Sequence, residues 1–157
     1  MIYYIQQDFL SLGHSFTILD EFKQDAFYVQ REMFTWGAKF SFKSDTGKEL
    51  AYIKQETILF PTYSILINDA QFATITQEFN WFKKSFVLDV PGPNDYLIEG
   101  SFWLREYVFK RNEKVVASVA KQPFSIPHYY NVEIAKDEDV VSILATCIVI
   151  DQILNSN

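Results

Sequence analysis

Hydrophobic and polar positions alternate along short stretches of this chain, and these stretches recur at a nearly constant interval. Alternation with a period of two is typical of a β-strand that buries one face. Six such segments have a central aliphatic residue, and these residues are 24, 24, 22, 23 and 21 positions apart: Ile5, Val29, Ile53, Ile75, Ile98 and Val119. The interval predicts a repeated unit of about 22–24 residues, which has room for one hairpin and a connection.

A second alternating segment precedes most of these. "SLGHSFTI" (11–18) and "TWGAKFSF" (35–42) match at the same offset of 24, and looser copies follow at 61–67, 82–88 and 104–109. Clusters of Asn, Asp, Gly and Pro, such as "SDTGKE" and "PGPND", separate the two parts of each unit at hairpin spacing. The phenylalanines expected in the core are Phe16, Phe40, Phe42, Phe86 and Phe109.

Each unit therefore predicts one β-hairpin, and the whole chain predicts a mainly β protein of about twelve strands. The strands are expected near 2–7, 15–19, 26–31, 38–43, 49–54, 62–67, 71–77, 84–89, 95–100, 105–110, 115–121 and 128–134. Consecutive hairpins form an antiparallel meander, and a meander of this length must close or split to protect its edges. A closed barrel is favoured, because a propeller with four strands in each blade would have only three blades.

The segment "KDEDVVSILATCIVIDQIL" (136–154) has a different pattern and predicts a helix over about 138–154. The carboxylates of residues 137–139 stand where helix starts favour them, as caps and as partners of the helix dipole. Apolar residues cover almost the whole circumference, with Ser142 and Thr146 as small polar exceptions. A helix of this kind is buried either in a protein core or in a membrane.

Length separates these two possibilities. The fifteen residues of "VVSILATCIVIDQIL" span about 22 Å as a helix, whereas the hydrocarbon core of a bilayer is about 30 Å thick. A twelve-stranded barrel leaves an interior too wide for its own side chains, which a helix about 10 Å across would fill. Leu144, Cys147 and Ile148 are therefore expected in the barrel core, and membrane insertion is the less favoured alternative.

Composition narrows the class of protein. With 157 residues, 48% of them hydrophobic and 17% aromatic, the chain is expected to form a single domain over 1–157. Its formal charge of −6 argues against nucleic acid as a partner. One cysteine excludes an internal disulfide and a cysteine-based zinc site. The start, "MIYYIQQDF", lacks the pattern of a secretory signal, so a cytoplasmic protein is expected.

Residues suited to catalysis are few and isolated. His14 and His128 belong to no metal-ligand or triad motif. Cys147 falls in the apolar helix, where burial raises the pKa of a thiol and makes it inert. "KDEDVV" lacks the ligand spacing of a calcium loop, and there is no glycine-rich phosphate loop. The sequence therefore predicts no catalytic, metal or cofactor site, and a protein that is not an enzyme.

Aromatic and basic residues form one candidate binding surface. The candidates are Trp81, Lys83 and Lys84 in "WFKKSF", and Arg105, Lys110 and Arg111 in "LREYVFKR". Mixed aromatic and basic side chains suit the interface of an anionic membrane. The alternative interpretation is a solvated outer face, and the net charge of −6 opposes binding to anionic surfaces unless the cations are clustered.

Longer segments resemble a known family. These are "FLSLGHSFTILDE" (9–21), "GKELAYIKQETILFPTYSI" (47–65), "VPGPNDYLIEGSFWLREYVFKRNEKVVASVAKQ" (90–122) and "DVVSILATCIVIDQIL" (139–154). They resemble the LURP-one-related family, in the Tubby C-terminal-like and phospholipid-scramblase-like group. The resemblance implies a twelve-stranded antiparallel barrel around a hydrophobic C-terminal helix. The wider group is linked to phosphoinositide binding, membrane-tethered transcription regulation and lipid scrambling, whereas the LURP-one branch has no settled activity.

Residues and resemblance together predict a non-enzymatic cytoplasmic binding module, peripheral at a membrane, for a phosphoinositide or another anionic lipid. A protein-interaction or regulatory scaffold is the alternative, suggested by Tyr3, Tyr63 and Tyr129, which are expected on the surface. A scramblase is less favoured, because the C-terminal helix would have to leave the barrel and span lipid. An enzyme is less favoured because no catalytic constellation occurs.

Overall fold

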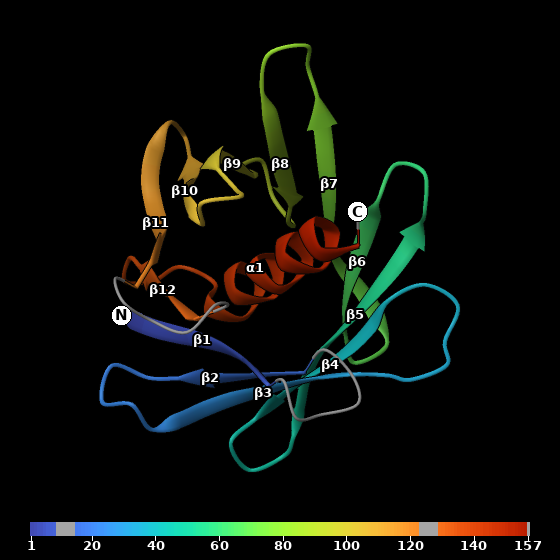
Figure 1. The fold of residues 1–157 in the computed structure, drawn as a ribbon, viewed down its shortest axis with the longest axis vertical. Helices are drawn as coiled ribbons and strands as arrows, with labels where there is room; N and C mark the ends of the chain where they lie inside the picture. The colour runs from blue at the N-terminus through green and yellow to red at the C-terminus, as the bar shows by residue number, and fades with distance from the viewer. Residues whose placement is uncertain (9–14, 123–128, 157) are drawn as a thin grey trace.

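The computed structural model describes residues 1–8, 15–122 and 129–156, in which it has twelve strands and one helix (Figure 1). The strands are β1 (Ile2–Asp8), β2 (Ser15–Leu19), β3 (Asp25–Arg31), β4 (Lys39–Ser44), β5 (Glu49–Thr57), β6 (Thr62–Ile67), β7 (Ala70–Phe79), β8 (Lys84–Asp89), β9 (Tyr96–Ser101), β10 (Glu106–Arg111), β11 (Lys114–Lys121) and β12 (Tyr129–Ile134). The helix is α1 (Val140–Asn155). Each strand lies within a few residues of its predicted position, and β5 and β7 are longer than predicted.

The twelve strands form one closed antiparallel barrel. Every strand pairs with its neighbours in sequence, and β1 pairs with both β2 and β12. Beside the closing pair, the N-terminal ammonium of Met1 donates to the carbonyl oxygen of Ile134 at 2.9 Å. Closure satisfies the backbone groups that edge strands would otherwise expose. The predicted mainly β barrel is therefore confirmed.

The repeated aliphatic residues form a ring inside the barrel. All six, from Ile5 to Val119, lie on odd-numbered strands and are at most 3% exposed. Inward apolar side chains of neighbouring strands stand beside them; Phe42, for example, is opposite Val29. The five phenylalanines predicted for the core are buried as well. The sequence repeat thus marks the point at which every second strand passes the middle of the barrel.

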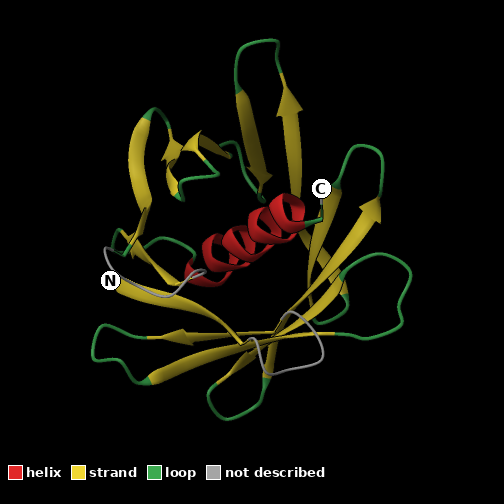
Figure 2. Cartoon of the chain, viewed as in Figure 1, coloured by secondary structure: helices red, strands yellow, loops and turns green. Residues whose placement is uncertain are grey.

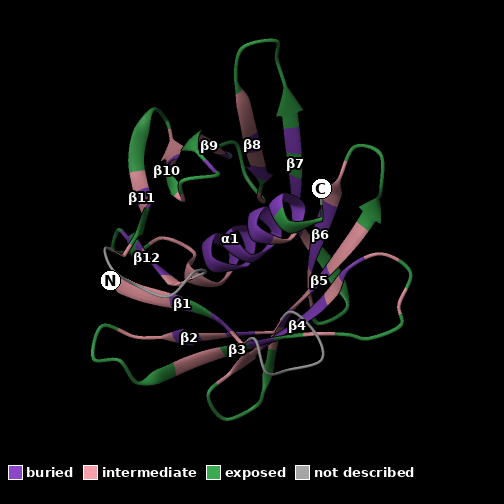
Figure 3. Cartoon of the chain, in the orientation of Figure 1, coloured by how far each residue is buried: buried purple, intermediate pink, exposed green. Residues whose placement is uncertain are grey.

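The helix α1 fills the centre of this ring (Figure 2). Nearly every residue after Val141 is buried, as the colouring along the helix shows (Figure 3). Leu144, Cys147 and Ile148 are fully buried. The hydroxyl of Thr146 donates to a carbonyl oxygen one turn earlier at 2.7 Å, so this polar group is satisfied within the helix. The apolar helix therefore packs on all sides against barrel side chains.

The acidic segment before α1 supplies its N-cap. The Asp139 carboxylate accepts hydrogen bonds from the backbone N–H of Ser142 at 3.1 Å and from its hydroxyl at 2.6 Å. This satisfies a donor that a helix start leaves without an intrahelical partner. The neighbouring Glu138 accepts a hydrogen bond from the Tyr96 hydroxyl at 2.7 Å and another from Arg111 at 2.7 Å. The start of the helix is thereby fixed to β9 and β10.

Connections between strands lie alternately at the two ends of the barrel. The first end carries the loops 20–24, 45–48, 68–69, 90–95, 112–113 and 135–139, and α1 starts there. The second end carries the described loops 32–38, 58–61, 80–83 and 102–105. The helix runs from the first end to the second, so its last turn lies among this second group of loops (Figure 1).

Candidate functional site

Exposed apolar side chains cover the end of the barrel where α1 finishes. They come from the four described loops of that end and from the end of β7, and we call them the apolar rim: Met33, Phe34, Trp36, Ile58, Leu59, Phe60, Phe79, Trp81, Phe82, Trp103 and Leu104. Phe34, Trp81 and Phe82 are 101%, 98% and 98% exposed, which means that they contact almost nothing in their own chain. Single exposed hydrophobic residues are ordinary, but a large group on adjacent loops marks an interaction site.

The opposite end has a different composition, and we call it the acidic end. Among the described residues of its six connections, Phe22 is the one large apolar side chain that is exposed. The charged residues of those connections are Asp20, Glu21, Asp45, Asp69, Asp95, Glu113, Asp137, Glu138 and Asp139, with Lys23, Lys48 and Lys136. The net charge of these nine acidic and three basic residues is −6, which equals the formal charge of the whole chain. The four rim loops contain Glu32, Lys83 and Arg105, so the barrel is polarised along the helix axis.

Three of the predicted lipid contacts lie at or beside the apolar rim. Trp81 belongs to it, and Lys83 follows in the same loop, where it forms an ion pair with Glu99 at 2.6 Å. The ammonium nitrogen of Lys84 lies 6.0 Å from the ring centroid of Trp103, which extends from the next loop. Trp81, Lys83 and Lys84 therefore lie together at this end of the barrel, and their role in lipid contact stays a prediction.

Two of the predicted contacts lie elsewhere. Lys110 and Arg111 are at the end of β10 that faces the acidic end, and they form ion pairs with Glu99 at 2.9 Å and Glu138 at 2.7 Å. Hydrogen bonds from Lys83 and Lys110 hold the pKa of Glu99 below its usual value, so this group stays ionised. Lys83 and Lys110 thus share Glu99, whereas Arg111 is held by Glu138 before the start of α1, so the predicted residues do not gather into one basic surface.

Arg105 points into the barrel instead of outward. Its guanidinium forms an ion pair with Asp151 of α1, and the two side chains are 13% and 2% exposed. It also lies 5.3 Å from the ring centroid of Tyr130. Burial raises the pKa of Asp151 to about 6, although the positive charge of Arg105 opposes this rise. The structure thus corrects the predicted surface position of Arg105, because a cation held by a buried carboxylate is not presented to a membrane.

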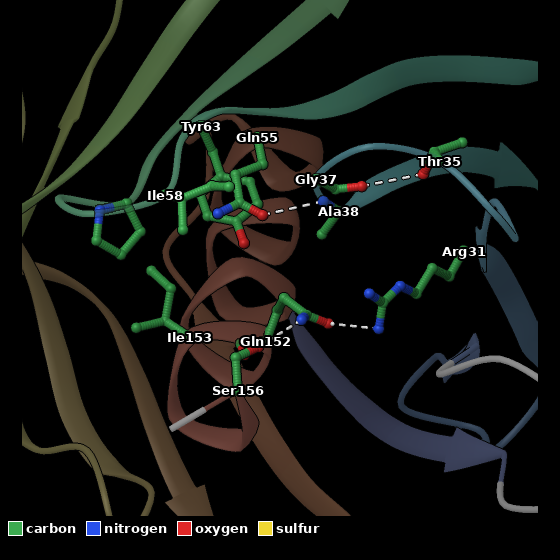
Figure 4. A pocket seen from close by; sticks show the side chains of 11 residues that line it. Arg31, Thr35, Gly37, Ala38, Gln55, Ile58, Tyr63, Gln152, Ile153 and Ser156 are labelled. Carbon is green, nitrogen blue, oxygen red and sulfur yellow. Dashed lines mark hydrogen bonds between the residues drawn. The ribbon is translucent and has the colours of Figure 1, made fainter.

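A pocket of about 330 Å³ opens at the rim between the loops 32–38 and 58–61 (Figure 4). Arg31 enters it from the end of β3, Tyr63 from β6, and Gln152 from the last turn of α1. The guanidinium of Arg31 donates to the side-chain oxygen of Gln152 at 3.3 Å. Of the described residues that line the pocket, Arg31 is the one with a formal charge.

The position of Tyr63 differs from the one expected from the sequence. The sequence places it among the surface aromatics, whereas it is 2% exposed and faces the barrel interior. Tyr3 and Tyr129 are partly exposed. Burial raises the pKa of Tyr63 to about 12, and the positive charge of Arg31 acts in the opposite direction. A signal was present, since Tyr63 stands two positions before the inward Ile65 on the same strand.

The single cysteine lies inside the barrel. Cys147 is fully buried, and burial raises the pKa of its thiol to about 12. His14 and His128 lie outside the described residues. The described ranges contain no group of three or more His, Cys, Asp or Glu side chains that could hold a metal ion. Within those ranges, no helix has the length and hydropathy needed to cross a membrane.

The closed barrel with one central helix can now be compared with known proteins. A family model described as LURP-one-related matches residues 1–151. The chain belongs to the LURP-one-related family. The predicted resemblance is thereby confirmed.

Two known proteins are similar to this LURP-one-related chain. The uncharacterised protein YxjI of Bacillus subtilis (strain 168) is 31% identical over 152 residues, which cover 96% of this chain and 92% of YxjI. The X-ray structure of a protein from Arabidopsis thaliana has a TM-score of 0.72 at 12% identity, covering 97% of this LURP-one-related chain and 91% of the other. The second likeness shows that the fold is shared.

Proposed function

We propose that this LURP-one-related barrel is a non-enzymatic binding module that docks on a membrane surface with its apolar rim in the headgroup region. The observation that supports this most directly is the rim itself. It gathers eleven exposed apolar side chains from four loops and the end of β7, and Phe34, Trp81 and Phe82 are almost fully exposed. Fluid lipid can surround projecting side chains individually, whereas a protein partner would need a pocket for each of them.

The chemistry of the rim fits a bilayer interface. Tryptophan is enriched at the boundary between water and hydrocarbon, and the rim contains Trp36, Trp81 and Trp103. Burying about 100 Å² of a side chain such as Trp81 or Phe82 contributes about 2.5 kcal/mol. Two such side chains are enough for measurable binding, and the rim provides several more.

The distribution of charge supports one orientation. With the rim in the membrane, the acidic end points away from the lipid, which minimises repulsion by an anionic leaflet. Lys83 and Lys84 are then near the headgroups, but Lys83 is already paired with Glu99. Apolar insertion is therefore the main driving force, and binding should depend only weakly on salt.

Vesicle flotation tests this proposal with one double variant and one matched control. Trp81→Ser with Phe82→Ser removes two fully exposed rim side chains and should weaken binding to phosphatidylcholine vesicles at least about tenfold. Phe22→Ser removes an exposed aromatic from the acidic end and should leave binding unchanged. Vesicles with about a third of anionic lipid should bind similarly well.

Two outcomes would contradict membrane docking. The wild-type protein could fail to float with either type of vesicle, which would favour a protein partner for the same rim. Alternatively, Phe22→Ser could weaken binding as much as the double rim variant does, which would show that exposed aromatics act without regard to position. Thermal melting of each variant establishes that the fold is retained.

A further inference from the structure

We propose that the pocket between loops 32–38 and 58–61 binds a lipid head group with a single negative charge, a carboxylate or phosphodiester, and that Arg31 is its counter-charge. The proposal deepens the membrane-docking function and rests on it for the source of the ligand. Its basis is the geometry of the pocket and the pairing of the charges around it.

Arg31 differs from the other two arginines of the chain. Arg105 and Arg111 each form an ion pair with a carboxylate, of Asp151 and Glu138 respectively. Arg31 forms no ion pair with any carboxylate of the described residues, and its hydrogen bond to the neutral amide of Gln152 is long, at 3.3 Å. A partly buried cation without a counter-charge is unfavourable, and an anionic ligand would relieve this.

Tyr63 provides a second donor on the opposite wall of the pocket (Figure 4). The residue is almost completely buried, and its hydroxyl forms no hydrogen bond with a described residue. With its pKa raised to about 12, the phenol keeps its proton at neutral pH and acts as a donor. Arg31 and Tyr63 can therefore donate together to the oxygens of one anionic group, and hydrogen bonds of this charge-assisted type are strong.

The other polar groups of the pocket already have partners. The side-chain oxygen of Gln55 accepts from the backbone N–H of Ala38 at 2.9 Å, and its amide nitrogen donates to a carbonyl at 3.1 Å. The carbonyl oxygen of Gln152 near the end of α1 accepts from both the backbone N–H and the hydroxyl of Ser156, at 3.1 and 2.6 Å. This capping occupies an oxygen that would otherwise repel an anion.

Charge and size determine the class of ligand. One guanidinium balances one negative charge, so a head group with several phosphates would place uncompensated charge against the end of the helix. A volume of about 330 Å³ is near the lower end of the range for small-molecule sites. Ile58 and Pro61 form an apolar side of the pocket, and Ile58 belongs to the rim. An acyl chain would therefore leave the pocket along apolar side chains.

Titration with sodium decanoate below its micelle concentration, without vesicles, tests the pocket directly. Calorimetry should show that decanoate binds to the wild-type protein. Arg31→Gln should weaken this binding by about tenfold or more, and Tyr63→Phe should weaken it by about threefold or more. Lys43→Gln removes the same charge from the outer face, where Lys43 contacts Gln30, and should not change binding. Decanol, which has the same chain without the charge, should bind at least about tenfold more weakly than decanoate.

Several results would overturn the proposal. These are equal binding of decanoate to the wild-type protein and to Arg31→Gln, equal binding of decanol and decanoate, and no decanoate binding at all. If acetate or inorganic phosphate binds as tightly as decanoate with the same dependence on Arg31, the site takes a free oxyanion and the assignment to lipid is wrong. Thermal melting of both pocket variants verifies folding.

The rim variant separates this proposal from membrane docking. Trp81 and Phe82 do not line the pocket, so their double replacement should reduce vesicle binding and leave decanoate binding intact. Loss of vesicle binding in the wild-type protein with retained decanoate binding would refute docking alone. Vesicle binding that persists in a protein unable to bind decanoate would refute the pocket alone.

Discussion

Replacing Asp151 by Asn tests the electrostatics of the polar cluster inside the barrel. Asp151 is almost completely buried, and its pKa is raised from the usual 3.8 to about 6, chiefly by loss of solvent. Burial raises the pKa values of Tyr107, Tyr130 and Cys147, so these neighbours stay neutral over the acid range. Among these four neighbouring side chains, Asp151 is therefore the one whose charge changes over the acid range.

The sign and size of the effect follow from the two pKa values. Between about pH 4 and pH 6 the folded protein keeps a proton that the unfolded chain has released, so the free energy of unfolding falls as pH rises. The difference between 3.8 and about 6 corresponds to about 3 kcal/mol. This stabilising contribution is complete below the unfolded-state pKa and is lost above the folded-state pKa. An asparagine at this position stays neutral at every pH, so the free energy of unfolding of Asp151→Asn does not fall with pH through this group.

Urea unfolding at several pH values from 4 to 7.5, followed by circular dichroism, measures the effect. The free energy of unfolding of the wild type minus that of Asp151→Asn should decrease by about 2.4 kcal/mol over this range, because pH 4 lies just above the unfolded-state pKa. Comparison with the variant cancels the other carboxylates, including Glu99. Asp45→Asn, on an exposed loop, serves as a control whose difference from the wild type stays nearly constant. A wild-type minus Asp151→Asn difference that is constant or rises with pH would refute the reasoning.

Two further predictions concern packing. Leu144→Lys puts a charge in the centre of α1 and should destabilise the fold by about 5 kcal/mol or more, which would abolish cooperative melting. The control, Asn155→Lys at the exposed end of the helix, should melt normally. A folded Leu144→Lys protein with unchanged Tm would contradict the buried helix. Gly100 has a φ of +146°, and an added Cβ would lie 2.4 Å from a carbonyl oxygen of the adjacent strand. Gly100→Ala should therefore lower the free energy of unfolding in urea by about 3 kcal/mol. Gly47→Ala, where nothing lies within 4 Å of the added Cβ, should lower it by about 1 kcal/mol. Equal decreases for the two variants would show that the close approach at Gly100 is unimportant.

The fold could be predicted because its determinants are local and repeated. The same inward aliphatic position occurs on every odd-numbered strand, so one pattern read six times defines hairpins, strand number and the faces that become buried. The helix was predictable for a related reason: its apolar circumference and short length are properties of one continuous segment. Its start follows from capping chemistry that involves only Asp139 and Ser142, three positions apart.

The site was less accessible, because it depends on contacts between distant parts of the chain. Arg105 and Asp151 are 46 positions apart, and nothing in either local segment indicates that they meet inside the barrel. The apolar rim was hidden for another reason, since residues such as Phe34 and Leu59 look like additional core residues in a chain rich in hydrophobic residues. The position of the rim follows from the alternation of hairpin connections between the two ends of a barrel. Apolar residues in every second loop must therefore lie at the same end.

Closure of the barrel also has a consequence for folding kinetics. The pairing of β1 with β12 joins residues more than a hundred positions apart, as in the pair Ile2 and Glu133. Such non-local contacts raise the relative contact order, and chains with high contact order fold slowly. On the ribosome, hairpins can form one after another, but their inward faces remain uncovered until β12 and α1 have emerged. The elements of the barrel that emerge last thus complete its hydrophobic core, and chains that still lack them are the species most prone to aggregate.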